Sequence, residues 1–475
     1  MKMIMINGIT ASAITFLFVI SVLIVRDHFI SLLSSSSSNV GLAVQIVELQ
    51  KRFIRSTPEE FRAISATDDS VSSPTLDVNL RNQSPVIEQL GMVERQLARA
   101  RAAIRKAANA RNVSMDYLDK NRIYRNPRAF YQSYMEMERR LKVYVYEEGE
   151  IPIVHDGPCK NIYTSEGRFI HEMELWKIGG KRFRTKDPRA AHVYFMPFSV
   201  TWMVKYLYKP LSYDMTPLKQ FVSDYVRVIS TKHPFWNATS GSDHFMLSCH
   251  DWGPHASQGH PQVYNNSIRV LCNANSSEGF NPLKDVSLPE INLYDGNISP
   301  KLAHPSPNNY TDRPILAFFA GGLHGPIRPI ILHHWKSQTK PTIQVHEYLP
   351  NGSDYNSYLL RSKFCLCPSG YEVASPRIVE AIYAECIPVI ISDHYVLPFS
   401  DVLNWKAFSI EVKVSEIPMM EEILMGVSEE KYLRLLKGLR AVRRHFVFNQ
   451  PAKRFDVFHM ILHSVWLRRL NVRLG

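Results

Sequence analysis

Arg377 and Glu380 lie about one helical turn apart in a stretch, residues 364–399, that has the residue types of a ligand site. An arginine one residue into a helix, beside backbone N–H groups that have no helical partner, can bind an anion such as a phosphate. These residues therefore predict an anion-binding site. Further candidate positions in the same stretch are Ser369, Gly370, Ser375 and Asp393.

The pattern around these residues predicts a strand, a loop, a helix and a second strand. Residues 364–367 are a short apolar run typical of a buried strand, and residues 389–392 are another. Ser375-Pro376 is typical of an N-cap followed by the first helical residue, and the helix is expected to end before Pro388. A βαβ unit of this kind has parallel strands and gathers its polar residues at their carboxyl ends, where ligands bind. An ordinary βαβ unit with solvated ends would give the same pattern.

A second candidate loop follows the apolar strand predicted at residues 315–320. Gly321 and Gly322 would let backbone N–H groups approach a phosphate, and Arg328 would add positive charge. A plain turn explains these glycines equally well.

A third group, His250-Asp251-Trp252, follows a strand predicted to end at Ser248. His250 or Asp251 could take a proton from a hydroxyl group, and Trp252 could stack on a sugar ring. His155-Asp156 is a second candidate pair for the base. A His-Asp pair is more often structural, and the residues alone do not decide between these roles.

The first stretch closely resembles the C-terminal signature of the exostosin-like glycosyltransferases, glycosyltransferase family 47, in its plant cell-wall branch. The similarity covers roughly residues 141–467, and the glycine loop and the HDWGP motif occur in the family's order. Many relatives have a basic residue in the loop where this chain has Pro326, so a phosphate contact there would depend on Arg328 and the backbone. The residues that carry the signature are 364–370, 375–377, 380–381 and 386–389.

This resemblance implies an α/β protein of the GT-B type, with two Rossmann-like domains facing a cleft. It implies an inverting glycosyltransferase that moves a sugar from a UDP- or GDP-linked donor to a cell-wall or matrix polysaccharide. Arg328, Arg377 and the amides near Ser375 would bind the donor diphosphate in place of a metal ion, so no cofactor is expected. Glu380 would hold the nucleotide ribose, or would merely compensate the helix dipole. His250 or Asp251 would be the general base.

Two other functional classes remain open. A glycoside hydrolase would need two carboxylates facing each other across a sugar-binding cleft, and no pair is marked out by its context. A noncatalytic subunit or lectin would keep the fold and support a partner transferase, although the intact Arg328, Arg377 and Glu380 argue against it. The protein could also form homo-oligomers, or hetero-oligomers with other transferases.

The amino-terminal part predicts a membrane anchor and a stem. Residues 3–25 contain no charged side chain and are long enough to span a bilayer, after a cytosolic tail of residues 1–2. A cleaved signal peptide is the alternative. Residues 26–140 would be a stem with a basic amphipathic helix at residues 86–110, which could pack on the body, pair with a partner or contact acidic lipid or polysaccharide. The folded body is then predicted as an acceptor-side domain at 141–293, a linker at 294–312 and a nucleotide-sugar-binding domain at 313–475.

Glycosylation sequons and charge bear on the compartment and the partners. The spread of Asn-X-Ser/Thr sequons predicts a single-pass type II protein of the Golgi membrane with its body in the lumen. The net charge of +12 suits an anionic partner, while no nucleic-acid-binding motif appears. Some of the six cysteines are expected to pair in an oxidising lumen, although Cys365 and Cys367 could equally stay as buried thiols. The sequons are Asn82, Asn112, Asn237, Asn265, Asn275, Asn297, Asn309 and Asn351, and the other cysteines are Cys159, Cys249, Cys272 and Cys386.

Overall fold

The computed structural model describes residues 84–110, 122–174, 183–303, 313–336 and 342–472. The predicted anchor, residues 26–83 and 111–121 of the predicted stem, and the sequons Asn82, Asn112 and Asn309 lie outside these ranges. Within the ranges, no helix is both long and apolar enough to cross a membrane.

The first sheet has six parallel strands in the order β2-β1-β3-β4-β5-β6. Its strands are short and almost wholly buried, as expected for a parallel sheet covered by helices on both faces. The strands are β1 Val143–Val145, β2 Arg184–Thr185, β3 Val193–Phe195, β4 His244–Ser248, β5 Ile268–Leu271 and β6 Val286–Ser287. The helices between them are α5 Thr164–Glu174, α6 Val200–Leu207, α7 Thr216–Lys232, α8 Pro234–Thr239, α9 Gly253–Ser257 and α10 Pro261–Asn265.

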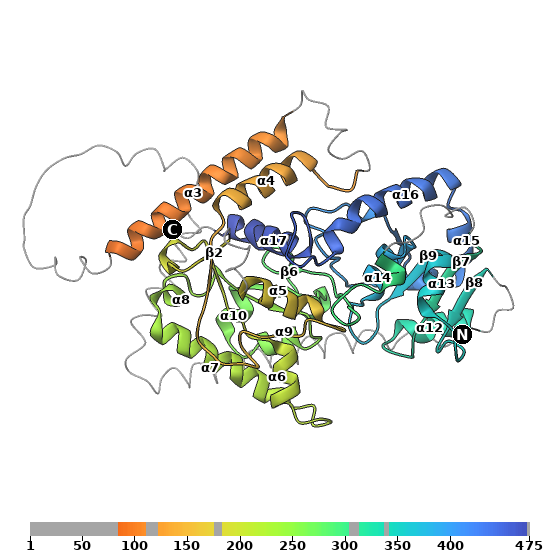
Figure 1. The fold of residues 1–475 in the computed structure, drawn as a ribbon, viewed down its shortest axis with the longest axis horizontal. Helices are drawn as coiled ribbons and strands as arrows, with labels where there is room; N and C mark the ends of the chain where they lie inside the picture. Colours follow the sequence, from red (N-terminus) through yellow and green to blue (C-terminus); the bar gives the residue numbers. More distant parts are fainter. Residues whose placement is uncertain (1–83, 111–121, 175–182, 304–312, 337–341, 473–475) are drawn as a thin grey trace, which may run out of the picture. The chain divides into compact units, whose positions relative to one another are not determined.

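The second sheet has five parallel strands in the order β11-β10-β9-β7-β8. Figure 1 shows α12 and α14 beside these strands. The strands are β7 Ile315–Ala320, β8 Ile343–His346, β9 Ser362–Pro368, β10 Ile387–Ile391 and β11 Ile410–Glu411. The helices are α11 Pro300–Ala303, α12 Ile327–Trp335, α13 Tyr355–Arg361, α14 Arg377–Tyr383, α15 Met420–Met425 and α16 Glu429–Val442. The chain therefore has an α/β fold with two parallel sheets.

The predicted βαβ unit is present, with shifted boundaries. Helix α14 begins at Arg377, and its N-cap is Pro376 rather than the predicted Ser375. The Ser375 hydroxyl still accepts a hydrogen bond from the backbone N–H of Arg377, at 3.4 Å. Strand β10 begins before Pro388, at Ile387, because a proline near the first residue of a strand removes only one hydrogen bond.

Helices α3 Ser84–Asn109, α4 Pro127–Arg140 and α17 Val457–Asn471 pack together, and α17 also contacts β5 and β6 of the first sheet (Figure 1). Of the alternatives for the predicted basic helix, packing on the body is the one observed. Leu97 of α3 is fully buried. The Arg469 guanidinium of α17 donates to Glu94 at 2.8 Å, and the Arg101 guanidinium donates to the carbonyl of Leu470 at 2.6 Å.

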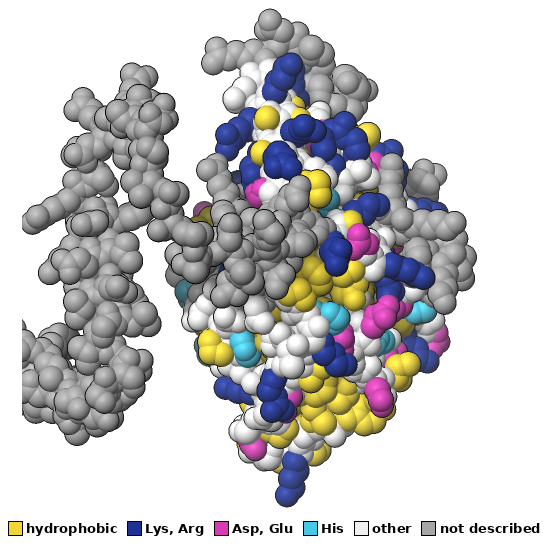
Figure 2. Space-filling view, turned by 90° about the vertical axis from the view of Figure 1, so that its left-hand side faces the viewer, with side chains coloured by type: hydrophobic (Ala, Val, Ile, Leu, Met, Phe, Trp, Pro, Cys, Tyr) yellow, Lys and Arg dark blue, Asp and Glu magenta, His cyan; other side chains and the backbone are white. Residues whose placement is uncertain are grey.

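The basic side chains of α3 lie on its opposite face. Arg95, Arg99, Arg105 and Lys106 are exposed, and Figure 2 shows Lys and Arg side chains gathered in the upper part of the visible face. The helix is therefore amphipathic in the predicted sense, with an apolar side on the body and a cationic side in solvent.

Four cysteines form two disulfides, each of which links two neighbouring parallel strands or the residues next to them. Cys249 pairs with Cys272 after β4 and β5, and Cys365 in β9 pairs with Cys386 before β10. The interpretation of Cys365 as a buried thiol is therefore wrong, because β9 and β10 are adjacent in the sheet and bring Cys386 within reach. Cys367 is a buried free thiol, as expected.

Candidate active site

Arg328 and Arg377 come from two adjacent strand-to-helix turns of the second sheet. Strands β7 and β9 pair directly, and each leads at its carboxyl end into a loop and then a helix. Arg377 is the first residue of α14, and Arg328 is the second residue of α12. The sheet therefore brings together two arginines that are far apart in the sequence.

The Arg377 guanidinium is partly held by the protein. Its Nη2 donates to the carbonyl of Ala320 at 2.9 Å, and its Nη1 donates to the hydroxyl of Ser375 at 3.3 Å. The guanidinium lies over the ring of Phe319, 4.9 Å from its centre. Its Nε is buried without a hydrogen-bond partner, so one donor of this side chain is left for a ligand.

Arg328 is more deeply buried, with 9% of its surface exposed, and its Nε also lacks a partner. Burial, and then the charge of Arg377, lower the pKa of Arg328 to about 10. Two guanidinium groups that repel each other in a buried place, each with an unused donor, would be stabilised by an anion between or beside them.

The predicted glycines make room for these arginines. A Cβ on Gly370 would lie 2.8 Å from Nη2 of Arg328, and a Cβ on Gly321 would lie 2.9 Å from Nη2 of Arg377. The two loops also meet directly, since Gly325, with a φ of +68°, approaches the carbonyl of Gly370. At Gly321 the glycine was expected to admit a phosphate to the backbone, and in the structure it admits a guanidinium.

The Glu380 carboxylate of α14 accepts hydrogen bonds from residues of two other segments. Its carboxylate accepts a hydrogen bond from the Tyr355 hydroxyl of α13 at 3.3 Å, and Asn292, which follows the first sheet, also hydrogen-bonds to it. Burial raises the pKa of Glu380, and the nearby Arg377 opposes that rise. The carboxylate is thus fixed in place, with its remaining acceptor capacity free for hydroxyl groups.

Among the residues that the structure describes, the remaining predicted donor-side residues form no hydrogen bond with the two arginine side chains. The Ser369 hydroxyl hydrogen-bonds with that of Ser392 at 2.8 Å and donates to the carbonyl of Val373 at 3.4 Å. Gly322 lies beside Tyr348, whose hydroxyl would be 3.3 Å from an added Cβ. Asp393 is exposed beyond the end of β10, and within the described ranges no contact joins it to the two arginines.

The predicted acceptor-side residues lie in the turn after β4. The His250 ring lies between Tyr163 and Trp252, with ring centres 4.8 and 5.3 Å away. Its Nδ1 accepts a hydrogen bond from the backbone N–H of Trp252 at 3.1 Å, and burial lowers the pKa of His250 to about 4. Trp252 itself packs edge-on against Tyr208. His155, the other candidate, pairs with Glu174 at 2.9 Å.

Asp251 belongs to a group of carboxylates that the sequence did not single out. Tyr163 hydrogen-bonds to the Asp251 side chain, while burial raises the pKa of Asp251. The charge of Asp251 in turn raises the pKa values of Glu290 and Glu372. Tyr163 has a left-handed φ of 67°, a conformation that costs a non-glycine residue about 1–3 kcal/mol and is common at functional sites.

A buried carboxylate, Glu166, holds this turn in place. One oxygen of Glu166 accepts from the backbone N–H groups of Cys249 at 2.9 Å and His250 at 3.4 Å. The other accepts from the N–H of Thr201 at 3.0 Å and from the Ser199 hydroxyl. No periodicity or motif marks Glu166 or Glu290 in the sequence, because their importance comes from segments that only the fold brings together.

Backbone hydrogen bonds join the two edges that carry these residues. The N–H of Val396, after β10, donates to the carbonyl of Ala274 at 3.0 Å, and the N–H of Phe399 donates to the carbonyl of Ser287 at 3.1 Å. The Asn273 side chain also donates to Glu372 at 2.6 Å. The arginines of the second sheet and the carboxylates of the first therefore form one polar cluster.

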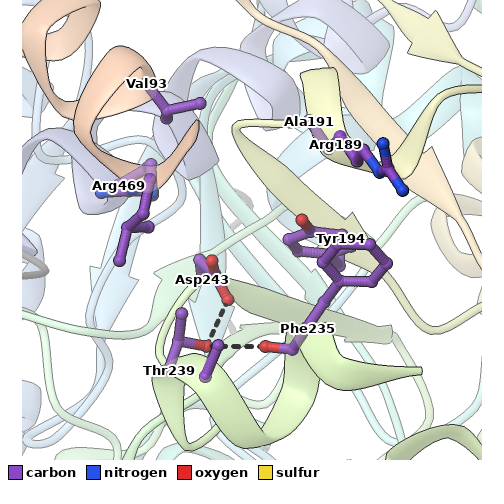
Figure 3. A pocket seen from close by; sticks show the side chains of 10 residues that line it. Val93, Arg189, Ala191, Tyr194, Phe235, Thr239, Asp243 and Arg469 are labelled. Carbon is purple, nitrogen blue, oxygen red and sulfur yellow. Dashed lines mark hydrogen bonds between the residues drawn. The ribbon is translucent and has the colours of Figure 1, made fainter. Parts of the chain in front are cut away.

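A separate small cavity lies where α3, α17 and the first sheet meet (Figure 3). Val93, Tyr194 and Arg469 are among its lining residues, and its volume of about 40 Å³ is far below the several hundred Å³ of typical ligand sites. No predicted site residue lines it. In the part of the chain that the structure describes, no three His, Cys, Asp or Glu side chains are arranged to hold a metal ion; the predicted independence of metal stays a prediction.

Comparisons with known proteins show the family of the chain. The Exostosin GT47 domain matches residues 137–427, which include both edges of the polar cluster. The chain is 56% identical over 422 residues to a probable glycosyltransferase of Arabidopsis thaliana, At5g25310, covering 88% of this chain and 85% of the relative. It is 50% identical to a second, At5g03795, covering 91% and 82%.

A more distant relative from Arabidopsis thaliana, the probable beta-1,4-xylosyltransferase IRX10, is 28% identical over 350 residues, covering 69% of this chain and 82% of the relative. The family match covers more than half of the chain. The matched part contains both parallel sheets and the two arginines at the carboxyl ends of β7 and β9. The chain belongs to the exostosin GT47 family and is a glycosyltransferase.

Proposed function

We propose that this protein is an inverting, metal-independent glycosyltransferase of the GT-B type, with two Rossmann-like domains facing a cleft. It transfers a sugar from a UDP- or GDP-linked donor to a cell-wall or matrix polysaccharide. The observation that carries this proposal is the pair Arg328 and Arg377, each with a buried Nε that lacks a partner. A nucleotide-sugar releases a diphosphate, and two guanidinium groups stabilise the charge that develops on it.

In the proposed reaction, an acceptor hydroxyl oxygen bonds to the anomeric carbon of the donor sugar as the bond from that carbon to the diphosphate breaks. The diphosphate leaves with the electron pair, and the hydroxyl proton passes to a base of the protein. Glu380, steadied by Tyr355 and Asn292, is placed to accept hydrogen bonds from the ribose hydroxyl groups of the nucleotide. The sequence predicts His250 or Asp251 as this base and Trp252 as an acceptor contact.

The proposal places the body in the Golgi lumen, held by the predicted anchor as a single-pass type II protein. Exposed sequons at Asn237, Asn265, Asn297 and Asn351 support this location. The two disulfides also support it, because disulfides persist in oxidising compartments. An assembly with other transferases is compatible with this location.

A donor screen on the full-length protein in detergent tests the proposal. UDP- and GDP-sugars, UDP-xylose among them, are tested for thermal stabilisation and for transfer to plant cell-wall oligosaccharides, with and without EDTA. We expect one donor to bind in EDTA, and the anomeric configuration of the product, measured by NMR, to be inverted. A folded protein that binds no donor would favour a noncatalytic or partner-dependent subunit, and loss of binding in EDTA would disprove metal independence.

A further inference from the structure

Glu290 is a buried carboxylate of the polar cluster, and its charge interacts with residues of both sheets. It follows β6, and only 4% of its surface is exposed. Residues before and after Glu290 in the sequence are held in place by hydrogen bonds. Ser287 accepts the backbone hydrogen bond that ties this segment to the second sheet, and Asn292 bonds to Glu380 in α14. The Glu290 side chain therefore belongs to a segment clamped against the helix that Arg377 begins.

The charged and titratable groups around Glu290 come from both sheets. Arg328 and Arg377 attract its negative charge, whereas Asp251 and Glu380 repel it. The tyrosines Tyr163 and Tyr395 also interact with its charge. Burial, followed by the charge of Asp251, raises the pKa of Glu290 well above its usual value. A carboxylate with a raised pKa takes up a proton more readily than an ordinary one, which suits a general base.

The two bases predicted from the sequence are occupied by structural contacts. The Nδ1 of His250 accepts the backbone N–H of Trp252, and the ring is enclosed by aromatic neighbours. Asp251 accepts a hydrogen bond from Tyr163. Among the described residues, by contrast, no side chain or backbone N–H donates a hydrogen bond to the Glu290 carboxylate. Of these side chains, Glu290 is also the one whose charge interacts with both arginines.

We propose that Glu290 is the general base of the transfer reaction. Its carboxylate takes the proton from the acceptor hydroxyl as that oxygen bonds to the anomeric carbon. The bond from the anomeric carbon to the diphosphate breaks, and the diphosphate takes the electron pair beside Arg328 and Arg377. Asp251 and Tyr163 position the acceptor. The negative charge of Asp251 also makes Glu290 a stronger base. This inference rests on the proposed function, because it requires a donor diphosphate at the two arginines.

The test uses full-length Glu290→Gln, with the exposed Glu430→Gln on α16 as the control, and measures donor binding by calorimetry and transfer rate from pH 5 to 9. A glutamine has the same shape and cannot take the proton. We expect transfer by Glu290→Gln to fall about 10²- to 10⁴-fold, with the donor Kd changed less than about threefold. In the wild type, activity rises with pH as Glu290 loses its proton, and this rise is absent from the residual activity of Glu290→Gln. Glu430→Gln keeps the wild-type rate and the rise.

Several outcomes would overturn this assignment. Transfer by Glu290→Gln within about threefold of the wild type, or with an unchanged pH profile, would show that Glu290 is not the base. A loss of donor binding equal to the loss of transfer would make Glu290 a binding residue instead. If Glu290→Gln does not fold, Glu290→Asp takes its place; a shortened base should slow transfer at least tenfold and keep the rise with pH, and an unchanged rate would refute the proposal. Failure of the proposed function looks different, because the wild type would then bind no donor.

Discussion

The charge of Arg377 lowers the pKa of Arg328, although the two side chains belong to helices that follow different strands of the second sheet. Burial lowers the pKa of Arg328 further, Glu290 opposes that lowering, and Glu380 stabilises the charge of Arg377. A diphosphate would bring more negative charge to both guanidinium groups and would offset their mutual repulsion.

Replacing either arginine should therefore weaken donor binding more than it weakens the fold. Removal of one charged hydrogen-bonding group costs about 1.5–3 kcal/mol, which raises the Kd for the donor about 10- to 150-fold. Arg377→Lys should lose most of this affinity as well, because an ammonium cannot keep both the Ala320 contact and a forked contact to phosphate. Calorimetry with UDP or the identified donor measures the effect. The exposed Arg434→Ala on α16 is the control, and an equal loss there would point to a nonspecific charge effect.

Gly370→Ala should impair donor binding at little cost in stability. The added Cβ would lie 2.8 Å from Nη2 of Arg328, so the guanidinium has to move, and the end of a long side chain can do so cheaply. We expect a Tm within a few degrees of the wild type and a clearly raised donor Kd. Gly91→Ala in α3, where the nearest atom would be 3.5 Å away, serves as the control and should stabilise the helix by up to about 1 kcal/mol. Normal donor affinity in Gly370→Ala would contradict this account of the glycine.

The second sheet and its two arginines could be predicted from the sequence because their signals are local. The apolar run at residues 315–320 coincides with β7, and the turn before Arg377 has recognisable residue types. Glu166 and Glu290 could not be predicted, since each is defined by partners from distant segments. The same reason hid the pairing of Cys365 with Cys386, which depends on β9 and β10 being neighbours in the sheet. Local sequence patterns predict helices and strands. A site formed by residues of two sheets also depends on how the strands are ordered and paired, which local patterns do not give.

The Cys365–Cys386 disulfide should contribute measurably to stability. It closes a loop with a sequence separation of 21, and a loop of that size corresponds to about 2–4 kcal/mol. Cys386→Ser should lower the free energy of unfolding by about that amount in denaturant titrations. The free Cys159→Ser is the control and should have little effect. Peptide mapping without reductant provides a direct check, and a Cys367–Cys386 pair in its place would contradict the assignment.

The sequons should differ in occupancy according to their exposure. Asn237, Asn265, Asn297 and Asn351 are exposed, and we expect glycans on these residues when the protein is expressed in plant cells. Asn275 is only 8% exposed, which leaves little room for a glycan on its side-chain nitrogen, so we expect this sequon to be unoccupied in the folded protein. Glycopeptide mass spectrometry measures the occupancy. A fully glycosylated Asn275 in folded, active protein would refute this expectation.

Glu372 should make stability depend on pH near neutrality. Burial, and then the charges of Glu278 and Asp251, raise the pKa of Glu372 from its usual 4.5 to about 7, against the hydrogen bond from Asn273. The folded protein therefore keeps a proton that the unfolded chain releases from about pH 4.5 upwards. The stabilisation from this proton is present at low pH and is lost as the pH rises through about 7.

Glu372→Gln removes this titration and keeps an oxygen that can accept the Asn273 hydrogen bond. At pH 5 the variant and the wild type should have similar Tm values, because both then carry a neutral side chain at this position. At pH 8 the variant should have the higher Tm, because the wild type must bury a charge beside Asp251. Glu430→Gln on α16, an exposed carboxylate, should give a Tm difference that does not change with pH. A pH-independent difference for Glu372→Gln, or a lower Tm at pH 8, would show that Glu372 stays ionised in the folded protein and that Asn273 alone determines its contribution.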